Sequence, residues 1–222
     1  MFYALSRDVE TVNLYSVSRY YGVTVVKTAV KNVISTLNTS MKKPPKIIAS
    51  KTLAQTRIFT IEQMQLQFAN GNQVEYERIV SSSSGAVLIV PLLDDKTIIL
   101  IREYCGGVQR YELAFPKGQV EAGESINASA NREIMEEIGF GANNLEFMKS
   151  VTVSPGYMSH HTHIVLASDL YQKKLPGDEP ESIETLYWSM DKLDDLLNND
   201  EFTEARSIAA LYLLKNRLMG GY

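Results

Sequence analysis

Two long apolar runs in the middle of the chain constrain its fold more than any other feature. They are AVLIVPLL, starting at Ala86, and TIILIREY, starting at Thr97, joined through Asp94-Asp95. Strands with continuous apolar runs, without polar residues at alternate positions, are typical of strands covered on both faces. We therefore predict a layered protein with these strands inside it.

The surrounding patterns indicate more strands than helices. An alternating run, IFTIEQMQLQF, reaches Asn70-Gly71 and continues as QVEYERIV, which predicts a β-hairpin. Later strands are predicted at RYELAF, LEFMKSVTV, THIVLASDLY and ETLYWSM. Helical patterns come late, at DKLDDLLNN and FTEARSIAALYLLKNRL. This order predicts a mixed α/β sandwich and not a regular succession of βαβ units.

A further helix is predicted within GQVEAGESINASANREIMEEIGF, which runs from Gly118 to Phe140. Ser125 is suited to cap its N-terminus, and Gly139 stands where a helix stop belongs. At about 100° per residue, three glutamates of this helix fall within an arc of about 100°. They are Glu133, Glu136 and Glu137.

Like charges at this spacing repel one another by a few tenths of a kcal/mol per pair. No Lys or Arg lies one turn away, and we expect the neighbouring Arg132 to point to the side. Hard divalent cations such as Mg²⁺ prefer oxygen ligands and commonly use carboxylates together with substrate phosphates. We therefore interpret the three glutamates as a cation site, in which the bound ion removes the repulsion.

The same stretch resembles the Nudix box, GX₅EX₇REUXEEXGU with U apolar, at every fixed position. The resemblance implies an α/β/α sandwich with a mixed sheet and a loop–helix–loop site where Mg²⁺, or alternatively Mn²⁺, binds a pyrophosphate. The implied metal ligands are Glu133, Glu136, Glu137 and the carbonyl group of Lys117. The implied supporting residues are Gly118 for a tight backbone turn, the pair Glu124 and Arg132, and Gly139 at the helix end.

The segment REYCGGVQRYELAFPKG resembles the corresponding region of ADP-ribose-type Nudix enzymes. This resemblance places Arg102 and Glu112 in the substrate pocket, although charges at strand ends are also common without any function. Residues 46–218 resemble the ADP compounds hydrolase branch more closely. That branch implies hydrolysis of ADP-ribose, adenosine dinucleoside polyphosphates and NADH, with release of AMP. Pro116-Lys117 before the box departs from the ADP-ribose enzymes and favours the broader branch.

An acidic loop, LPGDEPESIE, follows the box by about forty residues, where the resemblance implies a mobile loop that supplies the catalytic base. Glu181 is the first candidate and Glu179 the second, while Glu137 belongs to the catalytic set through the metal. A solvated acidic turn beside Pro180 is the alternative.

Charge and composition exclude some classes of function. The net charge of −4 offers no basic surplus for nucleic acid. No apolar run approaches the roughly 20 residues that span a bilayer, so we expect no membrane segment. A single cysteine, Cys105, gives no intramolecular disulfide and fits a reducing, cytoplasmic setting.

We expect residues 1–40 to be a dispensable extension, with a genuine N-terminal arm as the alternative. Residues 41–222 then form one Nudix domain, with the core and C-terminal helices in 85–222. The antiparallel strands predicted in 46–80 resemble those that pair two chains in related enzymes, so we expect a homodimer. Two rival functions are hydrolysis of surplus nucleoside triphosphates and nucleotide sensing without cleavage. The intact glutamates argue against a pure sensor.

Overall fold

The computed structural model describes residues 42–81, 84–177 and 179–220. The expected N-terminal extension, residues 1–40, therefore lies outside the described residues. Within the described part, the strands form two sheets. The smaller one has three strands in the order β1-β2-β3, which are Lys46–Gln55, Thr60–Gln67 and Gln73–Val80.

The larger sheet is mixed and has the order β10-β5-β4-β9-β8, with β6 added beside β5 and β7 beside β4. The pairing of β4 with β9 is parallel, and the other pairings in this sheet are antiparallel. Its strands are β4 (Ala86–Asp94), β5 (Thr97–Cys105), β6 (Arg110–Ala114), β7 (Lys117–Gln119), β8 (Phe140–Thr152), β9 (His161–Gln172) and β10 (Glu184–Ser189).

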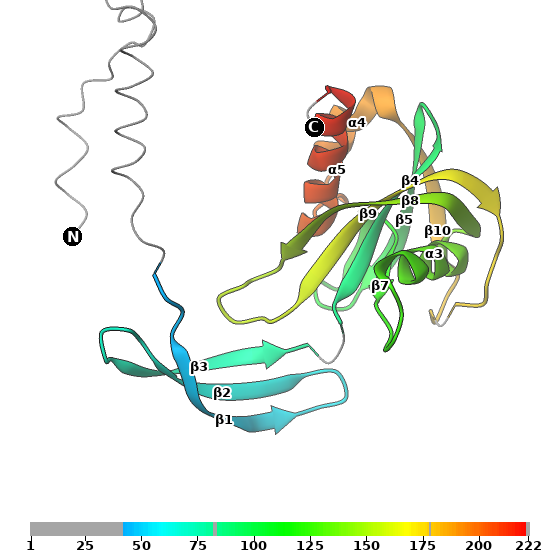
Figure 1. Cartoon of the computed structure of the whole chain (residues 1–222). Helices are drawn as coiled ribbons and strands as arrows, with labels where there is room; N and C mark the ends of the chain where they lie inside the picture. Colours follow the sequence, from blue (N-terminus) through cyan, green and yellow to red (C-terminus); the bar gives the residue numbers. More distant parts are fainter. Residues whose placement is uncertain (1–41, 82–83, 178, 221–222) are drawn as a thin grey trace, which may run out of the picture. The chain divides into compact units, whose positions relative to one another are not determined.

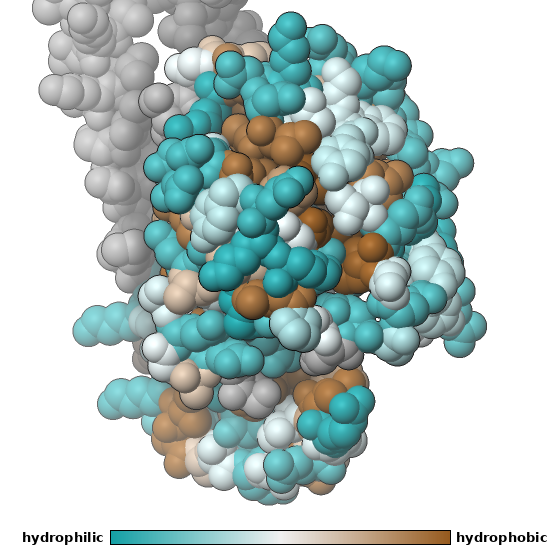
Figure 2. Space-filling model, turned by 90° about the vertical axis from the view of Figure 1, so that its right-hand side faces the viewer, coloured by the Kyte–Doolittle hydropathy of each residue, from teal (hydrophilic) through white to brown (hydrophobic). Residues whose placement is uncertain are grey.

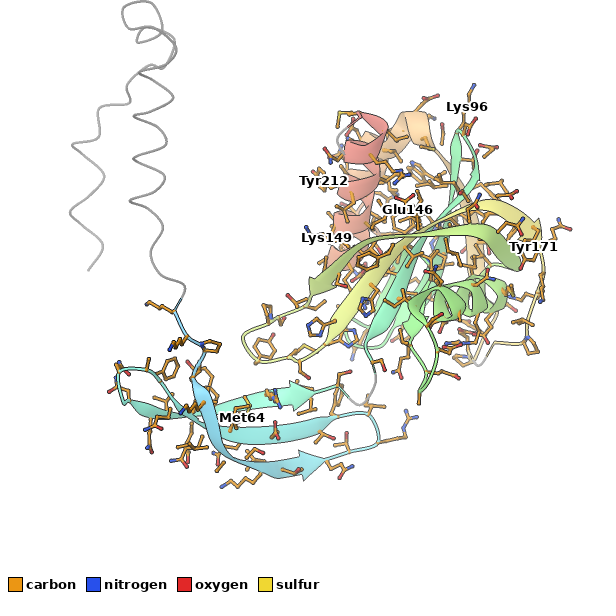
Figure 3. All side chains as sticks on the ribbon, in the orientation of Figure 1. Met64, Lys96, Glu146, Lys149, Tyr171 and Tyr212 are labelled. Carbon is orange, nitrogen blue, oxygen red and sulfur yellow. The ribbon has the colours of Figure 1, made fainter. Side chains whose placement is uncertain are left out.

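Alternation along β4 explains why helices cover both faces of this sheet. Val87 and Ile89 belong to one buried apolar cluster, together with residues of α3 (Ile126–Glu137). Leu88 and Val90 belong to a second cluster, with residues of α4 (Leu193–Leu197) and α5 (Ala205–Leu218). Figure 1 shows α3 and α5 on opposite faces of the sheet, and Figure 3 shows the side chains that fill the layers. The predicted α/β/α sandwich is therefore confirmed.

Helix α3 begins and ends where the sequence predicted. The hydroxyl oxygen of Ser125 accepts a hydrogen bond from the backbone N–H of Ala128 at 3.1 Å, which caps the helix. Gly139 has a φ of 76°, a left-handed conformation that glycine adopts without strain. Ala130 and Ile134 are fully buried against the sheet, so the helix is fixed by its apolar side.

Two short features differ from the sequence prediction. Strand β7 was not predicted, because three residues are too few for an alternating pattern and the resemblance implied only a tight turn at Gly118; the strand forms by pairing with the start of β4. The segment predicted as one helix at DKLDDLLNN is a 3₁₀ turn, Met190–Lys192, followed by α4. The hairpin at Asn70-Gly71 forms as predicted. Strand β1 was not predicted individually, and β8 begins five residues before the run predicted for it.

No helix among the described residues is long and apolar enough to cross a bilayer. On the face drawn in Figure 2, hydrophilic side chains predominate and hydrophobic ones reach the surface in patches between them.

We predict that replacing Phe202 by Ala lowers the free energy of unfolding by about 3–5 kcal/mol, because the substitution leaves a cavity. Phe202 is fully buried, and its ring meets that of Phe115 edge to face at a centroid distance of 6.2 Å. Urea denaturation measures the change. The matched control is Tyr212→Ala on the exposed side of α5, expected to change stability by less than about 0.5 kcal/mol. Equal effects of the two substitutions would contradict this packing.

Candidate active site

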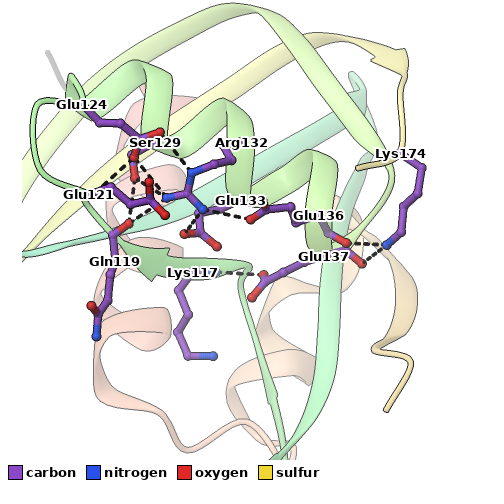
Figure 4. Close-up of polar contacts among 10 residues, drawn as sticks. All are labelled: Lys117, Gln119, Glu121, Glu124, Ser129, Arg132, Glu133, Glu136, Glu137 and Lys174. Carbon is purple, nitrogen blue, oxygen red and sulfur yellow. Dashed lines mark hydrogen bonds and ion pairs between the residues drawn. The ribbon is translucent and has the colours of Figure 1, made fainter. Parts of the chain in front are cut away.

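The guanidinium group of Arg132 lies among three carboxylates (Figure 4). Its Nε is 3.0 Å from Glu124 of the preceding loop, and its Nη1 is 2.8 Å from Glu133 and 2.9 Å from Glu136. The expectation that Arg132 points to the side is therefore wrong. The long side chain folds along the helix to the residue four positions on, where opposite charges attract. The protein itself thus offsets part of the repulsion between the glutamates.

Glu133 and Glu137 belong to the carboxylate-bearing face of the helix but are buried, with exposed fractions of 8% and 5%. Burial raises the pKa of Glu133 to about 7, against the opposing attraction of Arg132. Burial likewise raises the pKa of Glu137 well above its ordinary value, although Lys117 opposes the shift. Both carboxyl groups therefore lack full compensation for their charge within the protein. A nearby cation would favour their ionised forms.

The glutamates line a cavity of about 600 Å³ at the surface between α3, β5, β7 and the loop after β9. The backbone N–H of Lys117 donates to Glu137 at 3.0 Å, and the ammonium group of Lys117 pairs with Glu103. The lining is almost entirely polar, and its residues are Glu103, Lys117, Gly118, Gln119, Glu121, Arg132, Glu133, Glu136, Glu137, Pro176, Gly177 and Glu179.

These carboxylates do not form a ready-made metal cage. Among the described residues, no group of three or more His, Cys, Asp or Glu side chains is arranged to hold an ion. The reason is visible in their contacts, because Arg132 holds Glu133 and Glu136 while the Lys117 backbone holds Glu137. The donor set itself, several carboxylate oxygens without sulfur or imidazole, suits a hard divalent cation.

Gly118 is required for space and not for the tight turn expected from the sequence. A Cβ atom at this position would overlap the carboxyl group of Glu133, while the backbone of Gly118 is not left-handed. The close approach of β7 to α3 therefore depends on the missing side chain. This close approach keeps the Glu133 carboxylate against the segment that precedes the helix.

The structure separates the two loop glutamates. Glu179 lines the same cavity as the helix glutamates, and its negative charge is among the influences that raise the pKa of Glu133, after burial. Glu181 instead accepts a hydrogen bond at 2.7 Å from the hydroxyl group of Tyr111 and does not line this cavity. Both loop glutamates line a neighbouring pocket with Glu136 and Glu137, but of the two it is Glu179 that also reaches the cavity containing Glu133.

Arg102 and Glu112, predicted as substrate contacts, are occupied by protein partners and do not line the cavity. Arg102 pairs with Glu184 at 2.7 Å and with Glu201 at 2.8 Å. Glu112, only 4% exposed, accepts hydrogen bonds from Arg110 and Thr203. Burial alone would raise the pKa of Glu112, but these hydrogen bonds bring it below its ordinary value.

The sequence patterns did not identify Glu103 as a residue of the cavity. Glu103 stands next to Arg102 in β5, so the alternation of a strand sends the two side chains to opposite faces. The resemblance selected Arg102, and the alternation could have identified Glu103. The ammonium group of Lys117 was also overlooked, because only its carbonyl group was considered.

The site combines a carboxylate-bearing helix, the loop before it and a second acidic loop. Comparison with protein families agrees with this arrangement. A family model described as NUDIX domain matches residues 83–211, and one described as NudE-type Nudix hydrolase N-terminal domain matches residues 45–78. The chain belongs to the Nudix hydrolase family. Its helix α3 is accordingly called the Nudix helix below.

Several relatives of this Nudix hydrolase are known. ADP compounds hydrolase NudE of Escherichia coli is 45% identical over 184 residues, which cover 83% of this chain and 98% of the relative. ADP-ribose pyrophosphatase of Bacillus subtilis is 27% identical and covers 77% of this chain and 95% of its own. A crystal structure of an ADP compounds hydrolase has a TM-score of 0.75 at 43% identity, covering 82% of this chain and 98% of the other.

We predict that Gly118→Ala abolishes most hydrolytic activity of this enzyme while the domain stays folded, because the new methyl group displaces the Glu133 carboxylate. Hydrolysis rates measure the loss of activity, and thermal unfolding measures whether the domain stays folded. Gly156→Ala is the matched control, since a Cβ there meets nothing within 4 Å. A wild-type rate in Gly118→Ala would contradict the conclusion that activity requires the close approach of Gly118 to Glu133.

Proposed function

We propose that this Nudix hydrolase cleaves the pyrophosphate linkage of ADP-linked compounds in a Mg²⁺-dependent reaction and releases AMP. The substrates proposed are ADP-ribose, adenosine dinucleoside polyphosphates and NADH. The observation that supports this most is the cavity where Glu133, Glu136 and Glu137 of the Nudix helix meet Glu179. The names of the relatives, an ADP compounds hydrolase and an ADP-ribose pyrophosphatase, support the choice of substrate class.

We propose Mg²⁺ as the ion, with Mn²⁺ as the alternative, because an all-oxygen donor set fits both. Glu133, Glu136 and Glu137 would hold it, together with the carbonyl group of Lys117. A bound dication supplies neutralisation of phosphate charge and activation of water. Arg132 contacts Glu133 and Glu136, and the backbone N–H of Lys117 contacts Glu137. These protein groups would hold the carboxylates in place before the ion arrives.

The residues of the chain then divide the remaining tasks. The ammonium group of Lys117, now paired with Glu103, would attract the diphosphate of the substrate into the cavity. Glu179 would orient the attacking water and accept its proton as the new P–O bond forms and the bridging P–O bond breaks. The departing phosphate leaves as an anion. The sequence favoured Glu181 for the base; we propose Glu179, because Glu179 lines the cavity while Glu181 is engaged by Tyr111.

Arg102 and Glu112 stay predictions for the nucleoside end of the substrate. Each would have to exchange a protein partner for the ligand, since Arg102 is held by two carboxylates and Glu112 by Arg110 and Thr203. A guanidinium fork suits a phosphate, and a carboxylate accepts hydrogen bonds from ribose or adenine.

We also propose a homodimer formed through the smaller sheet. Every residue of β1 is exposed, and large apolar side chains of this sheet face solvent, including Ile47, Leu53, Val74 and Tyr76. Exposed apolar surface of this kind favours association. We further propose that residues 41–222 suffice for folding and catalysis, and that the enzyme acts in the reducing cytoplasm, where its one cysteine would persist as a thiol.

The test is product analysis after incubation of the purified enzyme with Mg²⁺ and ADP-ribose in H₂¹⁸O. We expect AMP and ribose phosphate, with the label in one of them, because water attacks a single phosphorus. NADH, diadenosine polyphosphates and deoxynucleoside triphosphates are assayed in parallel, with Glu133→Gln as the inactive control. Cleavage confined to triphosphates would favour the surplus-nucleotide hydrolase, and tight binding without cleavage would favour a sensor.

A further inference from the structure

The acidic loop between β9 and β10, described except for residue 178, is attached at its first end to the Nudix helix. The backbone N–H of Lys173 donates to the carbonyl of Gly139, and that of Leu175 to the carbonyl of Met135, each at 3.0 Å. The ammonium group of Lys174 contacts the carbonyl of Glu136 (Figure 4). A cation near a helix C-terminus is favourable, so this end of the loop is well fixed.

The second end of the loop leads into β10, which pairs with β5 from Glu184 onward, and Ile183 packs against the apolar cluster beneath α3. Nearer to Glu179, a side-chain hydrogen bond attaches the loop to the β5–β6 hairpin. The hydroxyl group of Tyr111 in β6 donates to the carboxylate of Glu181 at 2.7 Å. Tyr111 stands opposite Tyr104 in β5, and the two rings meet edge to face with centroids 5.6 Å apart. The contact restrains a ring that has few rotatable bonds, so the hydroxyl group of Tyr111 is held at a defined position.

Between the two attachments, Glu179 lines the cavity of the Nudix glutamates. Its position depends on a close fit to the loop itself, because a Cβ atom on Gly177 would overlap the Glu179 carboxyl group. The same position would lie 3.7 Å from the carbonyl oxygen of Glu136. The Glu179 carboxyl group therefore lies against Gly177, and the two attachments stand on either side of this pair in the chain.

We propose that Tyr111 is a positioning residue, whose hydroxyl group holds Glu181 and thereby keeps Glu179 directed at the carboxylates of the Nudix helix. The inference rests on the proposed function, in which Glu179 accepts the proton of the attacking water. In this proposal, Glu181 acts as a hydrogen-bond acceptor for Tyr111 and not as a base. Glutamine at this position retains that oxygen, whereas leucine does not.

The chemical roles of the two loop glutamates thus become separable. If Glu181 were the base, Glu181→Gln would abolish turnover and Tyr111→Phe would have a small effect. If Glu181 anchors the loop, Glu181→Gln keeps the hydrogen bond and most of the turnover. Tyr111→Phe and Glu181→Leu then have equal effects, because each removes the same bond.

The experiment measures kcat and KM for ADP-ribose in the full chain, and hydrogen–deuterium exchange of backbone amides in residues 179–183. For Tyr111→Phe and for Glu181→Leu we expect kcat to fall by about three- to tenfold with KM nearly unchanged, since substrate binding is retained. Exchange in the loop is expected to be faster in both. The double variant should lose no more than either single one.

Three controls accompany these variants. Tyr104→Phe removes a hydroxyl group from the adjacent ring, which makes no hydrogen bond to any described residue, and should match the wild type. Glu181→Gln should show wild-type exchange and nearly wild-type kcat. Glu179→Gln should lose turnover strongly without faster exchange in the loop, because the attachment at Tyr111 is intact.

The outcomes separate the inference from the proposed function. If the wild type cleaves ADP-ribose but Tyr111→Phe matches it in both kcat and exchange, the positioning role of Tyr111 is wrong. Loss of turnover in Glu181→Gln equal to that in Glu181→Leu would also overturn it. If the wild type cleaves no ADP-linked compound, the proposed function fails, and the exchange data still decide whether Tyr111 holds the loop.

Discussion

The guanidinium group of Arg132 joins carboxylates that would otherwise repel one another. It links Glu124 of the preceding loop to Glu133 and Glu136 on the helix, with nitrogen–oxygen distances of 2.8–3.0 Å. A planar group with several donors satisfies more than one carboxylate at fixed geometry, which an ammonium group does less well. Arg132 does not cancel the effect of burial, which raises the pKa of Glu133, and burial also raises the pKa of Glu137.

The helix that carries this cluster is fixed by the central strands. Alternate side chains of β4 leave opposite faces of the sheet, so one strand contributes to the clusters beneath both α3 and α5. The apolar side of α3 is buried against this sheet, and its glutamates are thereby presented at the edge where β7 and the acidic loop lie. Core packing and the position of the site are therefore consequences of the same alternating pattern.

Much of the fold and the main site helix could be predicted from the sequence. The apolar runs predicted the buried strands, while Ser125 and Gly139 predicted the helix ends, because these signals are local. Long-range contacts could not be predicted. The contact of Glu181 with Tyr111, 70 residues away in the chain, is one of them. By contrast, the pairing of Arg132 with Glu124 was implied by the resemblance, and its contact with Glu136 follows an i,i+4 spacing that was overlooked. Gly118 was assigned to a turn because its close neighbour, Glu133, is not visible in a linear pattern.

The most direct measurement is calorimetric titration of Mn²⁺ into the metal-free enzyme, compared with Glu133→Gln, Glu137→Gln and the distant control Glu146→Gln. Glu146 follows the helix closely in the chain, but its side chain is exposed on β8 and pairs with Arg217 of α5, the helix on the opposite face of the sheet from the glutamates. We predict binding in the wild type and in Glu146→Gln, and affinity at least about tenfold weaker in the two helix variants, because each loses a charged oxygen ligand. Undiminished affinity in both helix variants, or no binding by the wild type, would contradict the account.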